Sequence, residues 1–217
     1  MKILCIDACI STHPESRTRS LCCEYLRQLE SKGGTVERVE LEALSTVPLT
    51  KAALEKRDAL IRRGQYQDEM FALARQFREA DRIVVAAPYW DLSFPSVLKV
   101  YVEHIMVCGL TFQYVETGSV GLCRASALTY ITTAGGYIGN RNFGYEYIKS
   151  IAEMLGIGKA DLLCAEGLDI AGADVAQILA DTQIGLSECR TIPYPKSCQG
   201  HLREAEASDR ISPRQKA

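Results

Sequence analysis

The fold can be predicted from the stretch RIVVAAPYWDLSFPSVLKVYVEHIMVCG, residues 82–109. Its first part, residues 82–89, is almost continuously apolar, which is typical of a strand buried on both faces of a parallel sheet. Its last part, residues 96–109, repeats apolar side chains at helical spacing, with Pro95 near the first turn and Gly109 at its end. A strand followed by a helix in this way predicts one βα unit of an α/β protein.

The same alternation of apolar strands and helical patterns runs along most of the chain. The predicted strands are residues 2–8, 35–41, 82–89, 126–136 and 161–171. Five strands in this rhythm predict a flavodoxin-like parallel sheet of order 2-1-3-4-5, with helices on both faces. We expect residues 1–190 to form one domain. Residues 191–217 contain prolines and many charges, and we expect them to be an arm, partly disordered, over the surface or a partner.

Composition narrows the classes of partner. The chain has 217 residues, of which 47% are hydrophobic and 24% charged, with a formal net charge of −2. This charge offers no attraction for nucleic acid or an anionic membrane, and no apolar stretch is long enough to span a bilayer. The nine cysteines show no C-x-x-C spacing and no nearby histidine pair. We therefore expect reduced cysteines in a cytoplasmic protein, and no metal site.

In an open parallel sheet, ligands bind at the carboxyl ends of the strands. The loop after the first strand, ACISTHPESRTRS at residues 8–20, carries hydroxyl groups and two arginines and leads into a helix. The N-terminus of a helix has unpaired N–H groups and the positive end of a dipole, which suit a phosphate. Alternatively, Ser16 caps the helix and the arginines are solvated. The loop alone does not decide between these interpretations.

Two further loops lie at the same predicted edge of the sheet. The turn at residues 88–92 follows the third strand, and TTAGGYIGN at residues 132–140 follows the fourth. Gly135 and Gly136 allow the backbone to approach a flat ligand closely. No dinucleotide or P-loop motif is present. A phosphate-type loop, an aromatic turn and a glycine turn together predict a planar phosphorylated cofactor with a single nucleotide half, namely FMN.

A family resemblance rests on the block at residues 87–122, which begins APYWDLSFP and ends TFQYVETGSVGL, followed by YITTAGG at 130–136. These motifs resemble the FMN-dependent NAD(P)H:quinone oxidoreductases and NADH-azoreductases of flavodoxin-like fold, and the resemblance covers about residues 2–170. It implies that residues 1–190 bind FMN. It further implies a homodimer with FMN near the interface, NADH or NADPH as electron donor, and ping-pong hydride transfer to a quinone, azo, nitro or similar acceptor. Catalysis would then need no dedicated side chain.

The resemblance also implies which residues surround FMN. Its phosphate would be held by Ser11, Ser16, Arg17 and Thr18. The ribityl chain and the ring edge would lie against Pro88, Tyr89, Trp90, Asp91 and Leu92. The turn that closes over the ring would be formed by Thr133, Ala134, Gly135 and Gly136. Tyr114 would reach toward the substrate side.

Asp91 departs from the family pattern, which has asparagine at this place. An ionised aspartate cannot donate a hydrogen bond to the flavin. Either the backbone N–H of Asp91 makes the flavin contact, or its carboxylate caps the helix that begins near Phe94. We favour the backbone contact.

Two other classes of function remain as alternatives. One is a flavodoxin-type electron carrier, which binds FMN but reduces no organic substrate. Such carriers tend to be markedly acidic, whereas the net charge here is −2. The other is a cofactor-free interaction protein in which PYWD, residues 88–91, contacts a partner.

Overall fold

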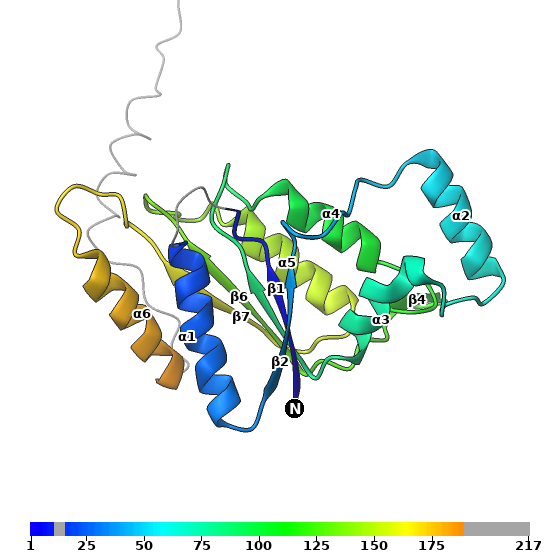
Figure 1. The fold of residues 1–217 in the computed structure, drawn as a ribbon, viewed down its shortest axis with the longest axis horizontal. Coiled ribbons are helices and arrows are strands. Elements are labelled where there is room, and N and C mark those ends of the chain that lie inside the picture. Colours follow the sequence, from blue (N-terminus) through cyan, green and yellow to red (C-terminus); the bar gives the residue numbers. More distant parts are fainter. Residues whose placement is uncertain (11–15, 189–217) are drawn as a thin grey trace, which may run out of the picture.

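A parallel sheet lies at the centre of the protein. The computed structural model describes residues 1–10 and 16–188, and Figure 1 shows their arrangement. The sheet consists of β1 (Lys2–Asp7), β2 (Thr35–Glu40), β3 (Arg82–Ala86), β6 (Ala127–Thr133) and β7 (Ala160–Ala165). The predicted five-stranded parallel sheet is confirmed. Its order reads β2-β1-β3-β6-β7 because two further strands precede β6 outside this sheet.

Those two strands form a separate antiparallel hairpin, β4 (Phe112–Val115) and β5 (Gly118–Gly121). The hairpin is not among the strands predicted from the sequence. Each strand has four residues, and so short a segment gives too little alternation to be recognised.

The last two sheet strands end earlier than predicted, at Thr133 and Ala165 rather than at residues 136 and 171. The carbonyl groups of residues 134–136 accept hydrogen bonds at 2.9–3.2 Å from the N–H groups of residues 167–169. These two loops therefore bond to each other beyond the ends of the strands, instead of continuing the sheet.

Six α-helices are described. They are α1 (Arg17–Ser31), α2 (Lys51–Arg62), α3 (Ala72–Glu79), α4 (Ser96–Ile105), α5 (Phe143–Met154) and α6 (Val175–Glu188). Helix α2 ends before Gly64, which has a φ of +66°. Asp68 caps the short 3-10 helix η1 (Glu69–Phe71) in front of α3.

The helices cover both faces of the sheet, as predicted. Helices α1 and α6 lie on one face, and α4 and α5 lie on the other (Figure 1). The apolar stripe of α1 is buried, namely Leu21, Cys22, Tyr25, Leu26 and Leu29. Full burial of a large apolar side chain contributes about 1.5–3 kcal/mol, so both layers stabilise the sheet that positions the loops. None of the described helices is long and apolar enough to cross a membrane. The predicted C-terminal arm lies outside the described residues.

Candidate functional site

Backbone hydrogen bonds hold together the loops at the carboxyl ends of β1, β3 and β6. The N–H of Ala8 donates to the carbonyl of Ala86 at 2.8 Å, just beyond the end of β1. On the other side of β3, the N–H of Tyr89 donates to the carbonyl of Thr133 at 3.0 Å. The three loops singled out in the sequence therefore begin side by side at one edge of the sheet.

The first loop ends at the N-terminus of α1. Ser16 is the N-cap, because its side chain accepts a hydrogen bond of 3.3 Å from the N–H of Arg19. The N–H groups of Arg17 and Thr18 have no hydrogen-bond partner among the described residues. Free N–H groups at the start of a fifteen-residue helix can bind an anion. Ser16 thus acts as a cap, and no other described residue accepts a hydrogen bond from these two N–H groups. Ser11 lies outside the described residues.

The Thr18 side chain points away from this anion position. Its hydroxyl oxygen is 2.6 Å from that of Thr133, and both residues are buried. This hydrogen bond ties the first turn of α1 to the end of β6. At Thr18, the group left for a phosphate is therefore the N–H rather than the hydroxyl.

Both arginines beside the loop are paired with an acid, and each keeps part of its side chain exposed to water. Arg17 Nη1 lies 2.6 Å from Asp169 Oδ1, which belongs to the loop after β7. Arg19 Nε lies 2.8 Å from Asp7 Oδ2, and its Nη2 donates to the carbonyl of Cys9 at 2.9 Å. Sequence reasoning missed Asp7 and Asp169. An acid at the end of an otherwise apolar strand was the available signal for Asp7.

The second loop contains a tight turn between Trp90 and Ser93, which exchange backbone hydrogen bonds of 2.7 and 3.1 Å. Its central residues, Asp91 and Leu92, have φ values of +49° and +67°. Positive φ at both central positions is characteristic of a type I′ turn. Trp90 is 45% exposed, so the only tryptophan of the chain faces outward at the site instead of filling the core.

Asp91 does not cap the following helix, so that alternative is wrong. Helix α4 has Pro95 as its N-cap residue and no side-chain cap. The N–H groups of Asp91 and Leu92 have no partner among the described residues. Two backbone donors thus remain available at the turn, as the favoured alternative requires. The preceding Pro88 and Tyr89 are half-buried, and the Tyr89 hydroxyl donates to the carbonyl of Arg141 at 3.0 Å.

The third loop presents an open face at Gly136. A Cβ atom added at Gly136 would meet no heavy atom within 4 Å, whereas one added at Gly135 would lie 2.1 Å from Asp169 Oδ2. Ala134 is buried beneath them. Glu166, which sequence reasoning also missed, accepts a 2.8 Å hydrogen bond from the N–H of Ile138 and holds the end of this loop. Open space therefore borders Gly136, while Gly135 packs against the neighbouring loop.

These features fit the chemistry of FMN. The free N–H groups of α1 suit a phosphate, and those of the Trp90–Ser93 turn suit the carbonyl and nitrogen acceptors of a flavin ring. The open space at Gly136 admits a flat ring close to the backbone. The exposed Trp90 and Leu92 offer apolar surface to the same ligand.

Tyr114 is not brought to this edge within one chain. It is 71% exposed on the β4–β5 hairpin. The segment after the hairpin lies at the C-terminal end of α5. There the N–H of Cys123 donates a hydrogen bond to the carbonyl of Leu155. The segment then enters the amino end of β6, so the hairpin belongs to the opposite edge of the sheet.

Two cysteines, Cys9 in the first loop and Cys123 at the opposite edge of the sheet, are not poised as nucleophiles. Burial raises the pKa of the Cys9 thiol far above its usual range, and Asp7 raises it further. Burial raises the pKa of Cys123 to about 12. Both thiols therefore stay protonated near neutral pH.

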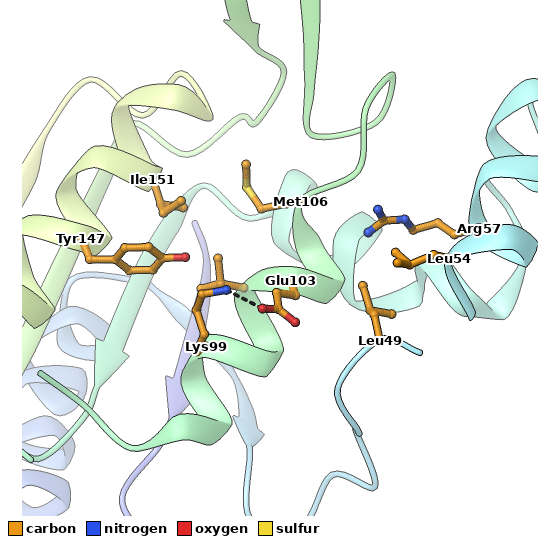
Figure 2. Close-up of a pocket in the computed structure, with 9 residues that line it drawn as sticks. Leu49, Leu54, Arg57, Lys99, Glu103, Met106, Tyr147 and Ile151 are labelled. Carbon is orange, nitrogen blue, oxygen red and sulfur yellow. Dashed lines mark hydrogen bonds and ion pairs between the residues drawn. The ribbon is translucent and has the colours of Figure 1, made fainter. Parts of the chain in front are cut away.

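A groove of about 460 Å³ lies elsewhere, between α2, α4 and α5 (Figure 2). It is lined by Leu49, Leu54, Arg57, Lys99, Val102, Glu103, Met106, Tyr147 and Ile151. Figure 2 shows Lys99 paired with Glu103 at its rim. No residue predicted for the flavin site lines this groove.

Residues 1–188 match the family model described as the flavodoxin-like fold. The FMN-dependent NADH:quinone oxidoreductase 2 of Clostridium acetobutylicum is 35% identical over 191 residues, covering 83% of this chain and 94% of that protein. An FMN-dependent NADH:quinone oxidoreductase of Coprothermobacter proteolyticus is 29% identical over 187 residues, covering 83% and 93%.

Solved structures agree with the fold. An FMN-dependent NADH-azoreductase of Bacillus anthracis, solved in complex with FMN, superposes with a TM-score of 0.72 at 24% identity, covering 87% of this chain and 96% of that one. A second azoreductase of the same species has a TM-score of 0.75 at 18% identity, with 87% and 97% covered. At these identities the likeness supports the fold alone.

Proposed function

The chain belongs to the flavodoxin-like family that includes the FMN-dependent NADH:quinone oxidoreductases, and on this premise we propose that it carries hydride from NADH, through bound FMN, to a quinone or azo compound. As a member of this family it is an oxidoreductase, with FMN as cofactor and NADH as electron donor. The choice of acceptor and the ping-pong order of the two half-reactions belong to the proposal.

One observation supports the proposal most directly. Two sets of backbone N–H groups, at Arg17–Thr18 and at Asp91–Leu92, have no hydrogen-bond partner within residues 1–10 and 16–188 and belong to adjacent loops at the carboxyl edge of the sheet. The open space at Gly136 belongs to the next loop of the same edge. A ligand with an anionic end and a flat polar ring matches this set of donors, and FMN has both parts.

The residues of the chain would bind and orient the cofactor. The start of α1, with Arg17, would hold the phosphate, and the Asp91 N–H would donate to the edge of the ring. Trp90 would shield one part of the flavin from water, and Gly136 would leave room for the ring. When bound, FMN supplies the hydride chemistry itself, so we assign no side chain the role of general acid or base.

We propose that the enzyme acts as a homodimer. Tyr114 is largely exposed and lies at the edge opposite to the flavin loops of its own chain. A second copy that placed its hairpin over these loops would bring Tyr114 to the substrate side. The exposed apolar side chains Val115 and Val120 on the same hairpin suit burial in such an interface.

Anaerobic flavin reduction tests the proposal. The purified protein is loaded with FMN, freed of excess flavin, and titrated separately with NADH and NADPH. NADH should bleach the bound flavin, and a quinone or azo dye should restore its colour. Parallel lines in double-reciprocal plots with varied NADH and acceptor would support the ping-pong order.

Two outcomes would favour the alternatives. A protein that retains FMN but is not bleached by either nicotinamide would be an electron carrier. A folded protein that retains no flavin, even with FMN added, would be an interaction protein on the same fold. Sedimentation of the loaded protein tests the homodimer separately.

A further inference from the structure

The two arginines at the start of α1 differ in how tightly their acidic partners are held. Arg19 pairs with Asp7, whose side chain is only 2% exposed and also accepts a hydrogen bond of 2.9 Å from the N–H of Cys9. Arg17 pairs with Asp169, whose side chain is 67% exposed. Separating the first pair would leave this buried carboxylate with only the Arg38 guanidinium, 3.9 Å away, as a cation, which is costly. Separating the second pair exposes both groups to water, which costs little.

This difference divides the roles of the two arginines. Arg19 also donates to the carbonyl of Cys9, so it fixes both ends of the loop between β1 and α1. Its charge is therefore committed to Asp7. The charge of Arg17, at the first residue of the helix, is balanced by a carboxylate that water can solvate.

Asp169 occupies a position between two parts of the proposed FMN site. Its N–H donates to the carbonyl of Gly135 at 2.9 Å, and its carboxylate lies where a Gly135 side chain would otherwise point. The same carboxylate reaches Arg17 at the phosphate end. An anion that approaches α1 thus meets an arginine whose charge is already neutralised by a carboxylate of the protein.

We propose that the side-chain carboxylate of Asp169 competes with the FMN phosphate for the guanidinium of Arg17. Binding of the phosphate moves the Arg17 guanidinium from the Asp169 carboxylate to the phosphate oxygens, and the carboxylate turns into water. Asp169 thereby lowers the affinity for phosphorylated flavin and narrows the preference for FMN over riboflavin, which has no phosphate. This inference rests on the proposed function.

The test compares dissociation constants for FMN and riboflavin, measured by quenching of flavin fluorescence in the wild-type protein and in Asp169→Asn. Asparagine keeps the N–H donor to Gly135 and removes the charge. An exposed ion pair is weak, so FMN should bind about two- to fivefold more tightly to the variant, while riboflavin binding stays unchanged. The gain should shrink in high salt, because the effect is electrostatic.

Two further variants make the test specific. In the Arg17→Met background, Asp169→Asn should give no gain, because the arginine for which the carboxylate competes is gone. Glu103→Gln is the matched control, since Glu103 also belongs to an exposed ion pair but lies at the groove of Figure 2. It should leave both dissociation constants unchanged.

Several results would overturn the proposal. Weaker FMN binding by Asp169→Asn would mean that Asp169 positions Arg17 instead of competing for it. An equal change for both flavins, or no change, would exclude a phosphate-specific effect. A gain that persists with Arg17→Met would indicate simple repulsion. If the wild-type protein binds neither flavin, the proposed function fails, and this inference fails with it.

Discussion

The hydroxyl oxygens of Thr18 and Thr133 lie 2.6 Å apart inside the protein and join the first turn of α1 to the last residue of β6. The two residues are 115 positions apart in sequence. Through this one contact, the loop that would receive the phosphate and the loop that would receive the ring share a fixed spacing.

Replacing Thr18 by valine removes this hydrogen bond and leaves the Thr133 hydroxyl unpaired in a buried place. We expect the free energy of unfolding, measured with urea, to fall by about 1–2 kcal/mol. Thr133→Val should do the same. The double variant should cost less than the two single variants together, because no unpaired hydroxyl remains. A strictly additive loss would contradict this interpretation.

Gly136→Val should reduce FMN retention without loss of stability. A side chain here enters space that is empty within 4 Å, where we propose the ring to lie. Gly158→Val is the matched control, because Gly158 is equally open but precedes β7 at the opposite edge of the sheet. After gel filtration, the Gly136→Val variant should contain less flavin than the Gly158→Val variant. The urea midpoints of both variants should equal that of the wild-type protein. Equal flavin content in both would exclude Gly136 from the ring site.

Leu92→Gly should stabilise the protein. Leu92 has a φ of +67°, which is unfavourable for a residue with a Cβ atom and natural for glycine in a type I′ turn. We expect a gain of about 0.5–1 kcal/mol in the free energy of unfolding. Leu92→Ala removes the side chain but keeps the strain, so it should give no such gain. A similar gain in both variants would assign the effect to the side chain.

Glu166→Ala should loosen the third loop. It removes the acceptor of the Ile138 N–H, and Ile138 is only 3% exposed. An unpaired buried N–H costs about 1–3 kcal/mol, and the exchange of this amide with deuterium should accelerate accordingly. Glu166→Gln retains an acceptor and should exchange at nearly the wild-type rate. Unchanged exchange in the alanine variant would show that the loop is held by other contacts.

Alkaline pH should destabilise the fold through its buried thiols. Burial raises the pKa of Cys123 and of Cys164 to about 12, whereas an unfolded cysteine titrates near about 8.5. Between these values the unfolded chain binds fewer protons than the native one, so the free energy of unfolding falls as pH rises. Urea unfolding between about pH 8 and pH 10 should show a shallower fall for Cys123→Ser/Cys164→Ser than for wild type. If the free energy of unfolding falls equally in the wild-type protein and in the double variant, these thiols are not the cause of the fall.

The parallel sheet and its flanking helices could be predicted because strands such as β3 are apolar after their first residue and helices such as α1 repeat apolar residues at helical spacing. The positions of the three candidate loops at one edge of the sheet followed from the topology. Which side chains those loops engage could not be predicted, because that depends on contacts between distant segments. Thr18 turned inward to Thr133, and Arg17 turned to Asp169, a residue 152 positions away.

The type I′ turn after β3 places a natural fluorophore at the proposed site. Its first residue, Trp90, is the only tryptophan among the 217 residues and is nearly half-exposed. All indole emission of the protein therefore originates beside the proposed cofactor position. Flavins absorb in the range where tryptophan emits, so energy transfer from this one ring would report occupancy directly, without a label and without turnover.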